Sequence, residues 1–239
     1  MKKLAFYCSA LVFFCISLVV QANGVKHGAI KIVPIEHASF VMENKKQVIF
    51  VDPTGDKSLY QVYSDPDLIL ITDIHGDHFK PELIKSLAAP KTQILAPQAV
   101  VDKLGEGQVI NNGESKRMRR LKITAIPMYN ITESRLKYHP KGRGNGYLID
   151  WAGQRIYISG DTEDTPEMRA LKDIDIALIC MNLPYTMTAK QAADAVIEMH
   201  PDIVIPYHFR GKNGFEDVDY FTKQVKKQGI QVDRLAWYP

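Results

Sequence analysis

Cysteine is scarce in this chain of 239 residues, which contains only Cys8, Cys15 and Cys180. The first two lie in an apolar segment at the amino end, and Cys180 stands alone in the run 176–181. A lone cysteine excludes an internal disulfide framework. Because Cys180 has no helix start or basic neighbour to make its thiol reactive, we expect a buried, inert side chain and not a nucleophile.

Long apolar runs are also missing, apart from one at the amino end. Lys2 and Lys3 precede the charge-free run Leu4–Val20, and Val20 and Ala22 are small residues at the positions that a signal peptidase requires. An uncleaved anchor is the alternative, although the run is shorter than the ~20 residues that span a bilayer comfortably. The pattern predicts a signal peptide over 1–22 and a mature domain over 23–239 that is periplasmic or secreted, without stable membrane insertion.

The mature chain lacks an excess of positive charge. Two of the 30 basic residues lie in 1–22, which leaves 28 basic against 27 acidic residues. Such a balance provides no basic surface for nucleic acid, so we expect no nucleic-acid partner. Basic residues are locally dense at 116–122, where they alternate with apolar ones. This alternation is typical of a half-exposed strand, which we favour over a phosphate site.

Hydrophobic periodicity and turn residues predict an α/β (α+β) domain. Strands come first, and strands then alternate with helices twice over, which indicates two sheets covered by helices. No low-complexity linker divides the chain. The expected strands are 29–35, 40–42, 47–51, 68–72, 93–96, 120–128, 147–151, 155–159, 175–180, 203–206, 230–232 and 235–238, and the expected helices are 81–87, 98–104, 215–227 and two that begin near 166 and 189.

The densest group of potential ligands follows the apolar run 68–71. On an extended backbone Asp73 and His75 point to the same side, and Gly76 allows the chain to turn so that Asp77 and His78 project into the same space. Imidazole and carboxylate are ligands for zinc and similar divalent ions. A polar turn that caps the following helix is the alternative. Two histidines and two aspartates exceed what such a turn needs, so the pattern favours a metal site.

Two more predicted strands end on potential ligands. Asp161 follows the strand 155–159, and His208 follows the strand 203–206. Taken separately, Asp161 is compatible with an ordinary turn and His208 with a histidine whose hydrogen bonds are satisfied. Because open α/β sheets gather their ligands at the carboxyl ends of their strands, we expect both side chains to join the 73–78 group.

These residues together resemble the metallo-β-lactamase superfamily. Its signature, His-x-His-x-Asp-His, is similar to 73–78, its bridging aspartate to Asp161, and its final histidine to His208. The segment 37–40 (His-Ala-Ser-Phe) and the pair 52–53 (Asp-Pro) look most similar to the branch of ascorbate-6-phosphate lactonase and N-acylphosphatidylethanolamine phospholipase D. The resemblance implies a four-layer αβ/βα sandwich with two divalent metal ions between the sheets.

The sequence departs from this signature in two places. Asp73 stands where the signature has its first histidine, and Tyr129 and Asn130 stand where a middle histidine is expected. The candidates to complete the first metal site are Asn130, His139 or another residue, and a partly empty first site is the alternative. The resemblance otherwise implies two ions, with zinc favoured over manganese or iron. The implied ligands are Asp73, His75, Asp77, His78, Asp161 and His208.

The implied activity is hydrolysis of a small-molecule ester, lactone, amide or phosphodiester by a metal-activated water. Asp77 is the predicted catalytic residue. His37, Asn130 and His139 are the predicted substrate-binding residues, and further candidates for binding an anionic group are Tyr129, Lys141, Arg143 and Arg210. His27 and His200 are not expected in the site. An exported metal-binding protein of the same fold without turnover is the alternative.

Overall fold

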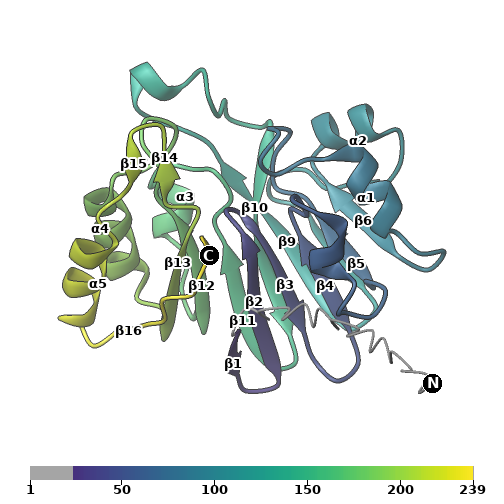
Figure 1. Cartoon of the computed structure of the whole chain (residues 1–239). Coiled ribbons are helices and arrows are strands. Elements are labelled where there is room, and N and C mark those ends of the chain that lie inside the picture. Colours follow the sequence, from purple (N-terminus) through teal and green to yellow (C-terminus); the bar gives the residue numbers. More distant parts are fainter. Residues whose placement is uncertain (1–23, 239) are drawn as a thin grey trace, which may run out of the picture.

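The computed structural model describes residues 24–238, so the predicted signal peptide lies outside the described residues. Two seven-stranded sheets stand face to face in the middle of the molecule (Figure 1). The strands of the first sheet pair in chain order. They are β1 (Val25–His27), β2 (Ile30–Glu36), β3 (Ser39–Glu43), β4 (Val48–Val51), β5 (Leu68–Leu70), β6 (Gln93–Ala96) and β7 (Gln108–Val109).

The second sheet has the order β16-β13-β12-β11-β10-β9-β8. Pairing is antiparallel from β8 to β11 and parallel from β11 to β16. Its strands are β8 (Ser115–Met118), β9 (Leu121–Met128), β10 (Gly144–Trp151), β11 (Gln154–Ile158), β12 (Ile176–Cys180), β13 (Ile203–Tyr207) and β16 (Gln231–Val232). A separate hairpin pairs β14 (Arg210–Gly211) with β15 (Gly214–Phe215).

Helices cover the outer face of each sheet (Figure 1). The helices α1 (Pro81–Leu87) and α2 (Gln98–Leu104) accompany the first sheet, and α3 (Pro166–Arg169), α4 (Ala189–Met199) and α5 (Val218–Lys226) accompany the second. Two short 3₁₀ helices, η1 (Lys57–Tyr60) and η2 (Glu133–Arg135), lie in loops. The four layers of helix, sheet, sheet and helix confirm the expected sandwich.

The core follows from the alternation of side chains along each strand. Phe40, Met42 and Ile49 point toward the second sheet and belong to one buried cluster with its residues. Val41 and Phe50, which alternate with them, point outward and pack in a second cluster with residues of α1 and α2. Each sheet is thereby buried on both faces, so the strand ends that carry the polar ligands are held rigidly.

Three sequence-based predictions of secondary structure are wrong. The last helix does not begin at Phe215, which lies in β15, because the Asp217 side chain accepts a hydrogen bond from the Tyr220 backbone N–H and caps α5. The segment 235–238 forms no strand. The predicted strand at 116–122 is interrupted at Arg119, whose positive φ of 53° makes the turn between β8 and β9.

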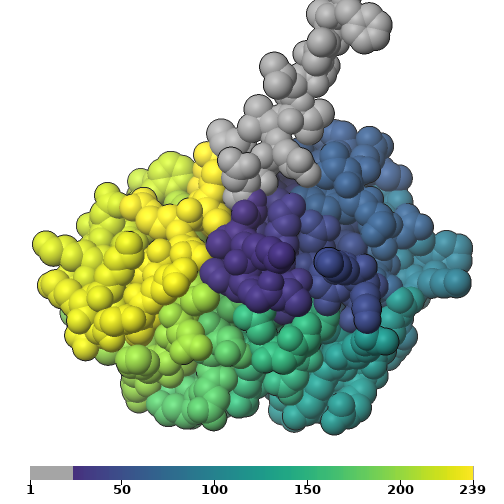
Figure 2. Space-filling model, turned by 90° about the horizontal axis from the view of Figure 1, so that it is seen from below, coloured from purple at the N-terminus to yellow at the C-terminus, as the bar shows by residue number. Residues whose placement is uncertain are grey.

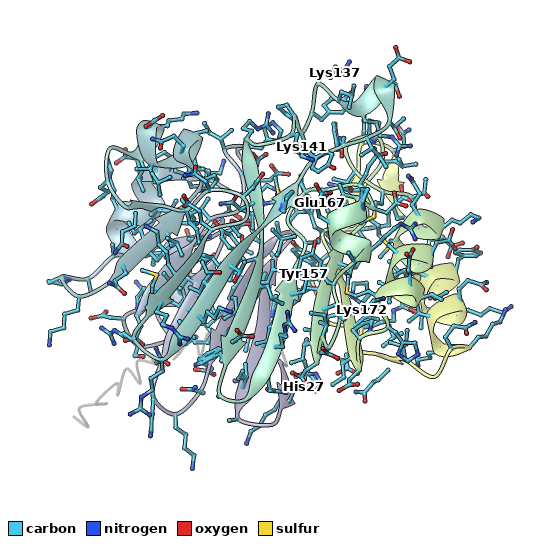
Figure 3. All side chains as sticks on the ribbon, turned by 180° about the vertical axis from the view of Figure 1, so that it is seen from behind. His27, Lys137, Lys141, Tyr157, Glu167 and Lys172 are labelled. Carbon is cyan, nitrogen blue, oxygen red and sulfur yellow. The ribbon has the colours of Figure 1, made fainter. Side chains whose placement is uncertain are left out.

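Seen from below, the first described residues lie between the yellow carboxyl-terminal residues and the blue ones of the first sheet (Figure 2). His27 lies at this lower end of the sheets, whereas Lys141 lies at the opposite end (Figure 3). Within residues 24–238, no helix has both the length and the apolar character that crossing a bilayer demands.

Candidate metal centre

Histidine and aspartate side chains from both sheets meet at one end of the sandwich. Asp52 follows β4, the segment 73–78 follows β5, Asp161 lies three residues after β11, and His208 directly follows β13. His139 comes from the loop that leads into β10. Three groups of donors, two of which share His208, lie close enough to hold a metal ion. They are His78, Asp161 and His208; Asp73, His75 and His139; and His37, Asp77 and His208.

The group of His78, Asp161 and His208, here called the inner group, is fully buried. The two Nε2 atoms of the histidines are 3.2 Å apart. The Asp161 carboxylate lies 3.3 Å from His78 Nε2 and 3.1 Å from His208 Nε2. Three donor atoms thus face a common point from two different sheets.

Asp52 supports the inner group from behind. Its Oδ2 lies 2.8 Å from His78 Nδ1, and it accepts further hydrogen bonds from the Thr72 backbone N–H (2.7 Å) and hydroxyl (2.5 Å). Because the carboxylate accepts a hydrogen bond from the Nδ1–H, the Nε2 lone pair of His78 is directed toward Asp161 and His208. Carboxylate–histidine pairs of this kind orient metal-binding imidazoles.

The electrostatics of the inner group favour a positive charge at its centre. Burial alone would raise the pKa of Asp161, but His208, His78 and His139 outweigh burial and hold that pKa well below its usual range. Burial would lower the pKa of His78, but the Asp161 and Asp52 carboxylates raise it well above its usual value. Carboxylates that attract a proton this strongly attract a metal cation at the same place.

The inner group fits a divalent ion by two observations. Asp161 Oδ1 is buried and accepts no well-aligned hydrogen bond among residues 24–238, although His208 Nε2 lies 3.1 Å from it, and this is a costly state for a carboxylate oxygen. The donor separations given above are close to the edge of about 3.3 Å expected for a tetrahedron with metal–ligand bonds of about 2.0 Å. Nitrogen and carboxylate oxygen donors suit zinc, and also iron and manganese.

The second group of donors, here called the outer group, consists of Asp73, His75 and His139. Asp73 Oδ2 lies 3.0 Å from His75 Nδ1 and 3.8 Å from His139 Nε2. His139 Nδ1 donates to the Tyr185 carbonyl at 3.1 Å, and its Nε2 lies 3.1 Å from Asp161 Oδ2. Asp161 therefore stands between the two groups, where a bridging aspartate is expected.

An arginine reaches into the outer group. Arg143 Nε donates to Asp73 Oδ1 at 3.1 Å, and Arg143 Nη2 donates to Asp73 Oδ2 at 2.8 Å. The same Nη2 lies 3.2 Å from His75 Nε2 and donates to the Tyr138 carbonyl at 2.6 Å. Burial would raise the pKa of Asp73, but His75 and Arg143 lower it, so Asp73 is a carboxylate paired with a guanidinium.

The third group connects the centre to the surface. His37 Nε2 lies 3.4 Å from Asp77 Oδ2, and His37 Nδ1 lies 2.8 Å from the Tyr238 hydroxyl. Burial lowers the pKa of His37 despite the opposing effect of Asp77, so the ring is neutral at pH 7. Burial raises the pKa of Tyr238 to about 12, so its hydroxyl stays protonated. A Tyr238 hydroxyl donating to His37 Nδ1 and a His37 Nε2–H donating to Asp77 satisfy both contacts.

A cleft of about 600 Å³ opens beside this third group. His37 and Asp77 line it together with Tyr238, a second carboxylate, Glu36, and two cations, Lys80 and Arg210. The Asp77 side chain is 43% exposed, which makes it the most accessible carboxylate of the centre. A second cavity of about 630 Å³, beside Lys31 and Trp151, contains none of the candidate ligands.

Several residues of the centre have a left-handed backbone. His37, Asp52 and His208 have φ values of 49°, 44° and 47°, a conformation that costs energy for residues other than glycine. Gly160 precedes Asp161 with φ 59°, and a Cβ there would lie 2.4 Å from the Met128 sulfur. The chain therefore turns sharply at these points to aim side chains into the space between the sheets.

Other residues named from the sequence lie elsewhere. Asn130 lies behind His139, with its Nδ2 3.3 Å from His139 Nδ1, and it donates to the carbonyls of Arg135 (2.9 Å) and Tyr185 (2.7 Å). Lys141 pairs with Glu167 at 2.8 Å, on the same end of the molecule but outside the donor groups (Figure 3). His27 lies 3.0 Å from Asp233, at the opposite end of the sheets, and His200 is exposed.

Sequence reasoning did not assign a role to two residues that the structure places at the centre. The sequence did hold a signal for Asp52, because this residue follows the predicted strand 47–51 and precedes Pro53. Asp161 and His208 likewise follow predicted strands. Tyr238 carried no such signal, since only the folded chain brings it to His37.

Comparison with known proteins agrees with this architecture. The family model described as the β-lactamase superfamily domain matches residues 31–208, a span that begins in β2 and ends at His208. A UPF0173 metal-dependent hydrolase of Methanopyrus kandleri is 28% identical over 221 residues, which cover 85% of this chain and 94% of that protein. A UPF0173 metal-dependent hydrolase of Thermococcus onnurineus is 31% identical over 192 residues, which cover 75% of this chain and 84% of that protein.

Solved structures give the same result. A protein from Parabacteroides distasonis, described as a metal-dependent hydrolase, superposes with a TM-score of 0.84 at 38% identity over 91% of this chain and 100% of that chain. A metallo hydrolase from Ignicoccus hospitalis superposes with a TM-score of 0.73 at 22% identity over 86% of this chain and 94% of that chain, which shows the shared fold. The superfamily prediction is confirmed, and the narrower branch named from the sequence stays a prediction.

Proposed function

This chain belongs to the β-lactamase superfamily as a metal-dependent hydrolase, and we propose that its catalytic ion is a zinc held by His78, Asp161 and His208. One observation carries the proposal, namely the buried Asp161 Oδ1 that accepts no well-aligned hydrogen bond among residues 24–238 while two histidine Nε2 atoms face the same carboxylate. Manganese and iron are the alternatives that the same donors allow. The second ion of the predicted pair would belong to the outer group, where Arg143 already supplies a positive charge.

The reaction that this centre supports is hydrolysis of an ester, lactone, amide or phosphodiester. A bound divalent ion polarises the scissile group and makes water acidic enough to act as a nucleophile near neutral pH. Asp77 lies at the edge of the inner group, with its Oδ2 3.6 Å from His208 Nε2, and its carboxylate is charged because His37 and His78 lower its pKa against the effect of burial. We assign Asp77 the acceptance of the proton from the attacking water and its delivery to the leaving group.

His37 positions Asp77 for this step. The ring is held on one side by Tyr238 and contacts the Asp77 carboxylate on the other, so Asp77 has a fixed direction relative to His208. His139, predicted as a substrate-binding residue, is buried between Asp73 and Asp161, and we assign it to the donor groups instead. Asn130 supports the loop that carries His139.

The substrate that suits the cleft is a small molecule with a negatively charged group. Lys80 and Arg210 line the cleft beside Asp77, and Tyr238 adds an aromatic wall on which the Arg210 guanidinium stacks at 4.9 Å. Two cations near the scissile bond would neutralise a phosphate or carboxylate of the substrate.

The proposal is tested with zinc-loaded protein and three generic substrates: a p-nitrophenyl ester, a homoserine lactone and bis-p-nitrophenyl phosphate. Hydrolysis of at least one of them is expected, together with its loss in Asp77→Asn at unchanged zinc content. The competing function, metal binding without turnover, would be established by full zinc occupancy with no hydrolysis of any of the three. The Asp150→Asn variant, an exposed position on β10, is the matched control.

We also propose that residues 1–22 are removed and that the mature chain is exported. Lys2, Lys3 and the apolar run Leu4–Val20 support the proposal, as do the small residues Val20 and Ala22. Amino-terminal sequencing of protein from the periplasmic or secreted fraction should begin at Asn23. Full-length protein that remains in the membrane fraction would contradict it.

A further inference from the structure

The outer group contains a cation that belongs to the chain itself. Arg143 donates to both oxygens of Asp73 through Nε and Nη2, the side-on arrangement in which a guanidinium grips a carboxylate. The same Nη2 lies 3.2 Å from His75 Nε2 and also donates to the Tyr138 carbonyl. We propose that Arg143 takes the place of the second metal ion, so that the enzyme works with one ion in the inner group and a fixed guanidinium in the outer group.

The bonding of Asp73 supports this proposal. Asp73 is fully buried, so its two oxygens have no water to exchange with, and both already accept charged hydrogen bonds from Arg143. By distance alone Asp73, His75 and His139 could surround an ion. An ion there would compete with the guanidinium for the same oxygens of Asp73. It would also place a double positive charge beside a single one in a buried site, which is strongly unfavourable.

The local chain path holds Arg143 in this position. Gly142 has φ 87°, which turns the loop, and Gly144 begins β10 directly after Arg143. A Cβ at Gly144 would lie 3.0 Å from the Thr72 carbonyl and 3.3 Å from Asp73 Oδ1. The backbone that carries Arg143 therefore packs closely against the strand end that carries Asp73. This close packing holds the guanidinium beside the Asp73 carboxylate.

The same pairing explains the departure at position 73. A histidine at this position would present one nitrogen to Arg143, and in its protonated form it would repel the guanidinium. A carboxylate accepts two parallel hydrogen bonds from the guanidinium and neutralises its charge. The presence of Arg143 thus explains why position 73 is an aspartate. Asp73, which looks like an altered metal ligand, is the ion-pair partner of Arg143.

This arrangement gives Arg143 a role in the reaction, and that role rests on the proposed function. Its side chain is 23% exposed, and the neighbouring His75 is 38% exposed, so the guanidinium can be reached by a ligand bound at the centre. We assign it the binding of a negatively charged oxygen of the substrate, opposite the ion across Asp161 and His139. Arginine cannot lose its proton near neutral pH, so this positive charge is permanent.

The test counts zinc ions. Purified protein is saturated with zinc, desalted, and measured by elemental analysis and native mass spectrometry. We expect one zinc per chain, lost in His208→Asn and retained in Asp73→Asn. Arg143→Ala should bind a second zinc, whereas Arg143→Lys, which keeps the charge, should stay at one. The double variant Asp73→His with Arg143→Ala should bind two.

Two zinc ions per chain in the unmodified protein would overturn the inference and leave the proposed function standing. A single zinc that His208→Asn retains and Asp73→Asn loses would also overturn it. No zinc at all would contradict the proposed function itself. Since Arg143→Ala removes a buried ion pair, circular dichroism is used to check that the variant is folded. A folded Arg143→Ala variant that still binds only one zinc counts against the inference. The zinc stoichiometry of the unmodified protein tests the inference without any variant.

Discussion

The inner and outer groups are built from the same two residue types, yet their neighbours give them opposite characters. Behind the inner group stands the carboxylate of Asp52, which directs a lone pair of His78 into the centre. Beside the outer group stands the guanidinium of Arg143, which draws the lone pairs of Asp73 and His75 toward itself. Under the proposal above, the charge of the next residue outward decides which of the two sets of histidines and aspartates receives a metal ion.

Burial separates the two groups at one residue. His78, Asp161 and His208 have almost no exposed surface, and Asp73 and His139 are equally buried, whereas the His75 side chain is 38% exposed. A buried set of donors cannot be satisfied by water and gains most from an ion. The partly exposed His75 can exchange its partners with solvent.

The largest expected effect comes from breaking the inner group itself. His208→Asn should abolish zinc binding and reduce kcat/KM by more than about 100-fold, since it removes a direct donor and not only a supporting residue. Elemental analysis and hydrolysis assays measure both effects. Asparagine tolerates the left-handed backbone at this position. His200→Asn, at an exposed histidine with the same backbone, should change neither quantity.

The next effect comes from removing the support of the inner group. Asp52→Asn keeps the shape of the side chain but turns an amide N–H toward His78 Nδ1. An acceptor is needed there for the hydrogen bond from the Nδ1–H. Zinc affinity should fall about 10- to 100-fold, as is typical for partners of metal-bound histidines. Competition with a chromogenic chelator measures the dissociation constant. Asp150→Asn serves as the control. If the zinc affinity of Asp52→Asn equals that of the unmodified protein, His78 needs no carboxylate partner.

A smaller effect is expected at the third group. Tyr238→Phe removes the hydroxyl that contacts His37 Nδ1 and that accepts from the Arg210 backbone N–H at 3.1 Å. A lost hydrogen bond of about 1 kcal/mol corresponds to roughly a fivefold decrease in kcat. Zinc content should not change, because Tyr238 touches no donor of the inner group. A parallel loss of zinc would show that His37 acts as a ligand and not as a positioning residue.

The smallest effect concerns the sulfur near the centre. Cys180 is buried, and burial raises the pKa of its thiol to about 11, so the thiol stays protonated at pH 8. In protein without residues 1–22, Ellman's reagent should label no thiol until guanidinium chloride unfolds the chain, when one thiol per chain should react. Rapid labelling of the native protein would show that the sheet around Cys180 opens.

Much of the scaffold could be predicted from the sequence because its signals are local. Pro81 begins α1 and Gly105 ends α2, and both helices have the predicted bounds. Thr188 and Gln191 cap α4 as a capping box. The short edge strands β1 and β7 were missed, since two or three residues acquire strand structure only from the neighbour with which they pair.

The centre was predictable where ligands end buried strands and unpredictable where they lie in loops. Asp161 and His208 follow strands, so their meeting follows from the sheet order. His139 lies in a loop whose path depends on the contacts of Asn130 with Arg135 and Tyr185, and no periodic pattern encodes those contacts. The sequence offered Arg143 as a candidate for binding an anionic group, but its pairing with Asp73 could not be predicted, because no local pattern brings these two residues together.

The contact between His37 and Tyr238 joins positions 201 residues apart. A ribosome that has made the first sheet has therefore made His37 and Asp77 but not the residue that aligns them. Contacts of such long sequence separation form late, after most of the chain has collapsed. Full hydrolytic activity should thus appear only at the end of synthesis and folding, and nascent chains that stop short of Tyr238 should be roughly fivefold weaker catalysts even when both sheets are in place.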